Sequence, residues 1–220
     1  NAPLSFTGGT DITTTFGRAD TSTFTVSGGT GSHTYAIAQT QSGITINTST
    51  GAVTVSSSLT AGTYYETVTV TDSKGYTLTK ALTVLVNAAV SVTGGQNITT
   101  TRAYQDTSTS FTFSGGTGSL TSALSGTSSS YITYDSSTGR LTVASGVAAG
   151  TYYETITATD SLGLTSTKST HIYINDVVTI SGGSDITTTS GVAKTSTAFV
   201  GARGTGNRVF ALSPPVSGIS

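Results

Sequence analysis

One sequence unit returns every 87 or 88 residues, and this period constrains the fold more than any other feature. The run Gly-Thr-Tyr-Tyr-Glu-Thr at 62–67 recurs at 150–155, 88 residues later. The run Ser-Gly-Gly-Thr-Gly at 27–31 recurs at 114–118, 87 residues later. Independent landmarks that agree on one period indicate a tandem repeat. We predict three units: residues 1–88, residues 89–177 and residues 178–220, the last being the first half of a repeat.

Within each repeat, apolar and hydroxyl side chains alternate with a period of two, which predicts strands. The strongest run, Tyr64 to Thr71, is followed by a polar turn that ends at Gly75 and by a second run from Tyr76 to Val86. Such a pair of runs predicts a hairpin. About seven strands per repeat, with turns every ~8–12 residues, form the pattern of an immunoglobulin-like sandwich. The sequence therefore predicts an all-β chain of tandem immunoglobulin-like seven-stranded β-sandwiches.

Composition excludes several classes of partner. Charged residues make up 9% of the chain and the net charge is −1, against roughly 25% charged residues in typical soluble domains. The basic residues are scattered singly, so we expect neither nucleic acid nor an anionic membrane as a partner. No apolar run approaches the ~20 residues of a membrane helix, and there is no Cys for a disulfide. This composition is typical of an exported domain at the cell surface or outside the cell.

The closing hairpin carries a family resemblance. The stretch 62–75 reads Gly-Thr-Tyr-Tyr-Glu-Thr-Val-Thr-Val-Thr-Asp-Ser-Lys-Gly. It resembles the closing hairpin of the cadherin-like and immunoglobulin-like tandem repeats of large prokaryotic cell-surface proteins and adhesins. The stretches 27–37 and 43–55 resemble the middle strands of the same repeats. The resemblance implies a cadherin-like sandwich and a role as spacer, stalk, surface-layer module or adhesive tip, and it specifies the fold better than the ligand.

The resemblance implies calcium as the candidate cofactor, because cadherin-like repeats often bind it between domains. Asp72 and Asp160 match the aspartate that follows the sixth strand in the family, which makes them the candidate metal ligands. Calcium requires several carboxylates that converge on one point, and the first linker, Asn87-Ala88-Ala89, contains none. Capping of the turn is therefore the favoured interpretation of both aspartates. We expect no cofactor, with calcium as the alternative.

A second candidate site is formed by Glu66 with Lys80 and, one repeat later, by Glu154 with Lys168. With Asp72 opposite Tyr76 across the turn, Val68 would face Lys80, and Glu66 would be its diagonal neighbour, at a distance of ~7–8 Å. We interpret each pair as a half-buried ion pair, or as a bulge that turns the lysine outward. An intramolecular isopeptide crosslink is the alternative, although its third member is not evident.

Neither catalysis nor a zinc site is expected. His33 and His171 occupy non-equivalent positions in their repeats, and no Cys accompanies them. A ligand-binding loop, by contrast, has one candidate constellation, Arg102 beside Tyr104, in a stretch where the repeats differ. Loops at one end of a sandwich are where such folds bind ligands.

The sequence thus favours a non-catalytic extracellular structural array: a stalk, filament or surface-layer component that spaces or assembles on a cell surface. Its expected partners are neighbouring copies of itself or further repeats of the same chain. The alternatives are an adhesin that binds cell-surface glycans or another cell, and a viral appendage or capsid decoration protein. A non-catalytic module of a secreted hydrolase is a further alternative.

Overall fold

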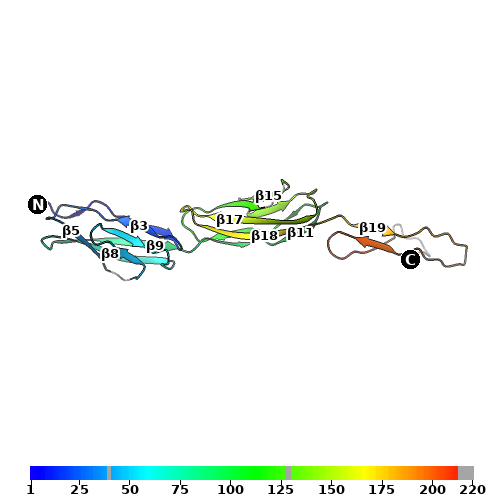
Figure 1. The fold of residues 1–220 in the computed structure, drawn as a ribbon, viewed down its shortest axis with the longest axis horizontal. Coiled ribbons are helices and arrows are strands. Elements are labelled where there is room, and N and C mark those ends of the chain that lie inside the picture. The colour runs from blue at the N-terminus through cyan, green and yellow to red at the C-terminus, as the bar shows by residue number, and fades with distance from the viewer. Residues whose placement is uncertain (39–40, 127–129, 213–220) are drawn as a thin grey trace. The chain divides into compact units, whose positions relative to one another are not determined.

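The computed structural model describes residues 1–38, 41–126 and 130–212. Every regular element in this part of the chain is a β-strand. Within the same ranges, no helix has the length and apolar character needed to cross a membrane. The fold is all-β (Figure 1).

Residues 1–88 contain nine strands. In chain order they are β1 (Ser5–Phe6), β2 (Ile12–Thr15), β3 (Asp20–Thr23), β4 (Val26–Ser27), β5 (His33–Ile37), β6 (Ile44–Ile46), β7 (Ala52–Val55), β8 (Gly62–Asp72) and β9 (Thr77–Asn87). One sheet has the order β2-β9-β8-β5 and the other the order β3-β7-β6, while β1 pairs with β4. Strand β2 runs parallel to β9, and the other pairs are antiparallel. These nine strand segments exceed the seven strands expected for the repeat.

The hairpin of β8 and β9 has the register expected from the sequence. Val68 lies opposite Lys80, and Glu66 lies opposite Leu82. The turn is closed by the Gly75 amide, which donates to the carbonyl of Asp72 at 3.0 Å. Gly75 has φ of 87°, a left-handed conformation that only glycine adopts without strain. The turn chemistry therefore fixes which face of each strand points inward.

The core of the first sandwich is built from alternate residues of its strands. Val68 and Val70 of β8 and Val84 of β9 are fully buried, as is Phe24 between β3 and β4. The intervening threonines of β8 are exposed or half-buried. Burial of a side chain of this size contributes about 1.5–3 kcal/mol. The period of two in the sequence thus becomes one apolar and one hydroxyl face.

Residues 89–177 repeat this arrangement. The strands are β10 (Ser91–Gly94), β11 (Ile98–Thr101), β12 (Asp106–Thr107), β13 (Phe111–Ser114), β14 (Thr121–Gly126), β15 (Ile132–Asp135), β16 (Arg140–Val143), β17 (Gly150–Thr159) and β18 (Thr165–Asn175). The sheet orders are β11-β18-β17-β14 and β12-β16-β15, and β10 pairs with β13. Strand β11 is again parallel to β18. The same sequence period has produced the same topology.

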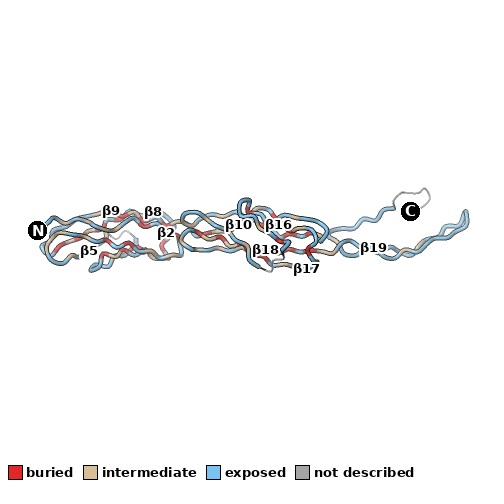
Figure 2. The backbone as a smooth tube through the Cα atoms, turned by 90° about the horizontal axis from the view of Figure 1, so that it is seen from above, coloured by how far each residue is buried: buried red, intermediate tan, exposed pale blue. Residues whose placement is uncertain are grey.

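The third repeat is different over the residues that the structure describes. It holds β19 (Thr179–Gly182) and β20 (Phe199–Ala202), which pair with each other. Its apolar side chains are exposed, among them Ile180 at 63% and Val200 at 57%. Figure 2 shows β19 in the colour of exposed residues, whereas buried segments appear along β8 and β16. Residues 213–220 of this predicted unit lie outside the described part.

The chain forms two compact units. Unit 1 is Asn1–Gly94, Phe111–Ala123 and Ile156–Lys168. Unit 2 is Gly95–Ser110, Leu124–Thr155 and Ser169–Ser220. These limits do not coincide with the sequence period, since β14, β17 and β18 contribute residues to both units. The repeat boundaries at 88 and 177 therefore stay a prediction.

Candidate functional site

The two candidate metal ligands occupy the same position after the long strands β8 and β17. Asp72 Oδ1 accepts hydrogen bonds from the amides of Lys74 and Tyr76 at 2.9 and 3.0 Å, and Oδ2 accepts one from the amide of Thr30 at 2.9 Å. The side chain is 5% exposed. The carboxylate therefore closes its own turn and also ties that turn to the loop at Thr30.

Asp160 repeats this capping in the second sandwich. Its Oδ1 accepts from the amides of Leu162 and Leu164 at 3.0 and 2.9 Å, and Oδ2 accepts from the amide of Thr117 at 3.0 Å. One further donor is present, the hydroxyl of Thr15, at 2.7 Å from Oδ2. Asp160 thus has the three amide donors of Asp72 and a hydroxyl in addition.

Both carboxyls are held in the ionised form. Burial raises the pKa of Asp72, but the amide donors of Thr30, Tyr76 and Lys74 outweigh it, so that the pKa lies below its usual value. Burial likewise raises the pKa of Asp160, and the amide of Thr117 and the hydroxyl of Thr15 contribute to a net lowering. The charge is stabilised by donors within the chain.

These donors do not suit calcium. Calcium takes six to eight oxygen ligands, whereas both oxygens of Asp72 already face N–H groups of the turn and the loop. Among the described residues, no three acidic or histidine side chains gather in one place. The geometry fits a capped turn better than a calcium site, and calcium at Asp72 or Asp160 stays an untested prediction.

The predicted partners Glu66 and Lys80 both lie on the core side of their strands. Glu66 is 4% exposed. The Lys80 ammonium donates to the carbonyls of Gly9 and Gly8 at 2.6 and 3.3 Å. It also lies 5.7 and 5.9 Å from the ring centroids of Phe24 and Phe6, within the range of a cation–π contact. Lys80 therefore anchors the loop between β1 and β2.

In the second sandwich, Glu154 is fully buried and Lys168 is half-buried. Glu154 lies on β17 and Lys168 on β18, which are neighbours in one sheet. For both repeats, an ion pair or an isopeptide crosslink between the glutamate and the lysine stays a prediction. The intact mass would decide on the crosslink, because each one removes a water or an ammonia.

The candidate ligand residues Arg102 and Tyr104 follow β11. The Arg102 guanidinium lies 3.6 Å from a carboxylate oxygen of Asp176, and Arg203 contacts the other oxygen at 2.9 Å. Tyr104 is 68% exposed, and its amide donates to the carbonyl of Thr101 at 2.8 Å. Arg102 thus has an ionic partner in its own unit, while the ring of Tyr104 is accessible.

A set of junction contacts that the sequence-based reasoning missed recurs along the chain. The last residue of each linking strand is an asparagine whose side chain donates to the threonine of the next Ser-Gly-Gly-Thr-Gly or related loop. Asn87 donates to Thr117 at 2.9 Å, within unit 1. Asn175 donates to Thr205 at 2.9 Å, within unit 2. The same two residue types thus make the same bond twice.

The main chain reinforces each of these contacts. The Gly116 amide donates to the carbonyl of Ala88 at 2.8 Å, and the Gly204 amide donates to the carbonyl of Asp176 at 2.8 Å. In the first case the neighbouring Gly115 has φ of 72°, and a Cβ there would collide with the carbonyl of Ala89. Glycine is therefore needed for this close approach.

A threonine from the parallel strand completes the junction. Thr15 ends β2 and lies opposite Asn87 in the register with β9. Its hydroxyl lies 2.7 Å from that of Thr117 and donates to Asp160. Thr101 ends β11 and lies 2.9 Å from Thr205 in the same way. The signal for these residues was present in the sequence, since all of them recur with the repeat period.

Comparisons with known proteins agree with this architecture. No protein-family model matches the chain, and no curated protein matches it. A structure of titin domains I67–I69, in a variant with Glu-to-Ala substitutions, has a TM-score of 0.57 and 14% identity, and the match covers 92% of this chain and 77% of that one. An I-band fragment I67–I69 from titin has a TM-score of 0.53 and 14% identity, covering 81% and 68%. At this identity the likeness concerns the fold alone: the chain is a tandem array of immunoglobulin-like β-sandwiches.

Proposed function

We propose that this chain is a non-catalytic segment of an extracellular repeat array, a stalk, filament or surface-layer component that maintains a spacing at a cell surface. One observation carries the proposal. The bond from Asn87 to Thr117 and the bond from Asn175 to Thr205 join the same two residue types, and each is 2.9 Å long. A periodic spacer needs linkers that are held in the same way at each step, because flexible linkers do not preserve a distance.

The local roles of the histidines support a non-catalytic function. Nε2 of His33 lies 3.0 Å from the carbonyl oxygen of Gly28. Nδ1 of His171 lies 3.3 Å from the hydroxyl of Tyr173. A nucleophile activated by a histidine would require a serine or cysteine within hydrogen-bond reach of the ring. These two rings instead join neighbouring parts of their own repeats.

The surface also suits a structural role outside a cell. The chain has no Cys, few charges and rows of exposed or half-buried threonines on the long strands. The resemblance of its repeats to those of large prokaryotic surface proteins is part of this proposal. The neighbours in the array would be further repeats of the same chain or copies of it.

Immunogold labelling of intact producing cells tests the proposal. An antibody against the chain should decorate filaments, stalks or a surface layer without permeabilisation, and brief protease treatment of the cells should remove the label. Labelling only after lysis would contradict it. Label confined to virus particles would assign the chain to a viral appendage or capsid decoration instead.

A second candidate, an adhesin that binds glycans, is favoured by one surface cluster. Tyr153 and Tyr173 are 55% and 39% exposed, and their rings lie 5.0 and 6.2 Å from the ring of His171 between them. Amphipathic rings that stay in water are typical of binding surfaces. A glycan array probed with the wild-type chain and with a Tyr153→Ala, Tyr173→Ala variant tests this candidate. Binding lost in the variant supports it, and no binding by the wild type excludes it for the glycans on the array.

A further inference from the structure

The face of the first sandwich around Thr30 and Asp72 has the acceptor groups that the second sandwich uses at its junction. Asn1 donates to the hydroxyl of Thr30 at 2.7 Å, as Asn87 does to Thr117. The Gly29 amide donates to the carbonyl of Ala2 at 2.8 Å, as the Gly116 amide does to Ala88. Half of the junction is therefore already formed at this face.

The other half of the junction has a defined direction of hydrogen bonding. Thr15 has one hydroxyl proton, and it donates that proton to Asp160 Oδ2 at 2.7 Å. Thr117, at 2.7 Å from Thr15, must then donate to Thr15, while it accepts from the Asn87 amide. The bonds run in one direction, from Asn87 through Thr117 and Thr15 to the carboxylate of Asp160. In this series each of the two hydroxyls accepts one hydrogen bond and donates one.

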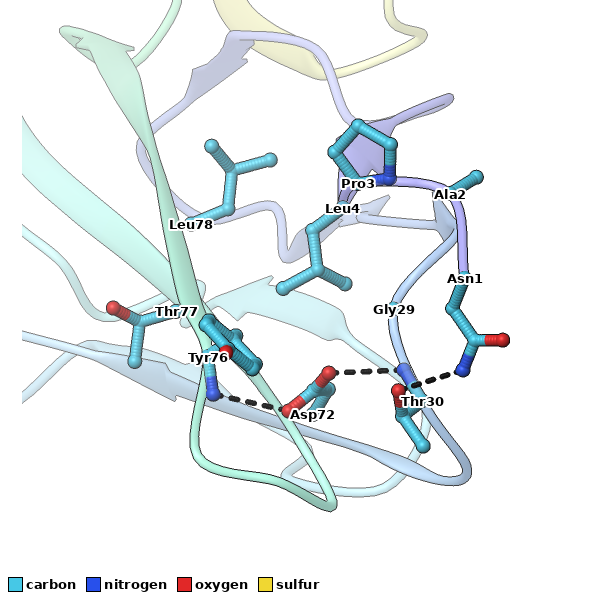
Figure 3. Close-up of a pocket in the computed structure, with 10 residues that line it drawn as sticks. All are labelled: Asn1, Ala2, Pro3, Leu4, Gly29, Thr30, Asp72, Tyr76, Thr77 and Leu78. Carbon is cyan, nitrogen blue, oxygen red and sulfur yellow. Dashed lines mark hydrogen bonds between the residues drawn. The ribbon is translucent and has the colours of Figure 1, made fainter.

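At Asp72 the structure describes no hydroxyl donor that corresponds to Thr15. Among the described residues, Oδ2 of Asp72 receives a hydrogen bond from the Thr30 amide alone, whereas Oδ2 of Asp160 receives one from Thr117 and one from Thr15. Asp72 and Thr30 line a hollow of about 580 Å³ together with Leu4 and Leu78, and Figure 3 shows these residues as sticks. The hollow combines an anionic acceptor with an apolar floor.

We propose that this face is a docking site for the end of another repeat of the same type, one whose Ile-Thr-Thr-Thr strand supplies a threonine in the role of Thr15. The inference rests on the proposed repeat array and names the residues that join its units. The occupant is defined by complementarity. It must bring a hydroxyl that donates to Asp72 Oδ2 and accepts from the hydroxyl of Thr30, and the chain carries this strand end at Thr15, Thr101 and Thr189.

The test uses cysteine pairs, because the chain has no native Cys. First, Thr15→Cys with Thr117→Cys in the full chain calibrates the method. These two side chains are in contact, so mild oxidation should give a monomer with one intramolecular disulfide, seen as a mass loss of about 2 Da and the loss of both free thiols. Failure of this pair to crosslink would overturn the junction itself.

Second, a copy of residues 1–86 is placed directly before Asn1, so that Asn1 takes the position of Asn87. In this extended chain, Thr15→Cys in the added copy is combined with Thr30→Cys. The proposal predicts a monomeric disulfide in a yield similar to that of the calibration pair. Oxidised dimers or persistent free thiols would overturn it.

Two controls keep the result specific. Thr30→Cys is exchanged for Thr133→Cys, an exposed residue on β15 that is outside the face, and this pair should stay reduced. Thr15→Ser in the added copy retains the hydroxyl, whereas Thr15→Val removes it, so only the valine variant should lower the thermal unfolding midpoint of the extended chain. The outcome is independent of cell-surface labelling, so a failed docking site and a failed proposed function are distinguishable.

Discussion

The first and third repeats place an equivalent phenylalanine in opposite surroundings. Phe24 is fully buried, while Phe199, in the same position of the repeat, is 53% exposed. Both rings lie against a glycine of the preceding loop, Gly9 and Gly183 respectively. The difference is that the core around Phe24 includes residues of β7, β8 and β9, and the described part of the third repeat has only β19 and β20. An apolar position becomes core only when a second sheet covers it.

The largest expected effect tests this comparison directly. Phe24→Ala should destabilise the first sandwich by about 3–5 kcal/mol, because it leaves a cavity between two packed sheets. Phe199→Ala should change stability by no more than about 0.5 kcal/mol, as for an exposed side chain. Urea unfolding followed by circular dichroism measures both. Equal losses would mean that Phe199 is also part of a core.

The second-largest effect on stability is expected from acid, because it affects both complete sandwiches. The folded pKa values of Asp72 and Asp160 lie below the usual 3.8. The stability that these carboxylates contribute is therefore present above pH ~4 and is lost as the pH falls through the folded values. Asp135, whose pKa is lowered to about 2 by the hydroxyls of Ser137 and Thr138, extends this loss to lower pH.

Thermal unfolding between pH 7 and pH 2 measures the acid effect. The midpoint should be level down to about pH 4 and then fall. Asp72→Asn and Asp160→Asn should each lower the midpoint at pH 7 and flatten its fall in acid. Asp185→Asn, on an exposed residue of the third repeat, is the matched control. If the midpoint of a variant with both Asp72→Asn and Asp160→Asn falls as steeply in acid as that of the wild type, other groups dominate the acid effect.

A smaller difference in stability is expected between substitutions at two lysines, one in the first repeat and one in the third. Lys80 anchors the carbonyls of Gly8 and Gly9 beside the core, so Lys80→Met should cost about 1–3 kcal/mol through acceptors that lose their donor. Lys194 of the third repeat bonds the carbonyl of Thr187 at 3.2 Å from an exposed position. Lys194→Met should have almost no effect on the urea midpoint. A loss at Lys194 as large as that at Lys80 would contradict the assignment of Lys80 as an anchor.

The smallest effect is expected at Asp176. Its contacts with Arg102 and Arg203 join side chains that are 48% and 58% exposed. Exposed ion pairs contribute about 0–1 kcal/mol. A double-mutant cycle of Arg102→Ala and Asp176→Ala should therefore give a coupling energy below about 1 kcal/mol that falls further in high salt. A larger, salt-independent coupling would show that the pair is shielded from solvent.

Part of the candidate site was accessible from the sequence because it depends on local geometry. The pairing of Val68 with Lys80 follows from the turn between Asp72 and Gly75, whose residues are adjacent in the chain. The inward side of Glu66 follows from strand alternation alone. What Lys80 bonds was not predictable in this way, since Gly8 and Gly9 are more than seventy residues away in the sequence.

Strand β2 is an element that the sequence pattern did not predict. Ile12 is the only apolar residue of Ile12–Thr15, so no alternation marks it as a strand, and the expected pattern omitted it. Its partner in the parallel ladder is β9, at the far end of the repeat. Thr15 and Asn87 acquire a common role only through this long-range pairing. Asp72 and Asp160, which the family resemblance linked to calcium, accept hydrogen bonds from amides, and Asp160 also accepts one from the hydroxyl of Thr15.

By itself, the sequence determined the all-β character, the period and the hairpin register, because these follow from residue spacing and turn chemistry along a continuous stretch of chain. The tertiary structure decided which threonines and asparagines meet, since every junction contact joins residues that are distant in the sequence. It also decided that Phe24 is buried and the equivalent Phe199 exposed. Burial depends on whether a second sheet is present to exclude water, and no single strand carries that information.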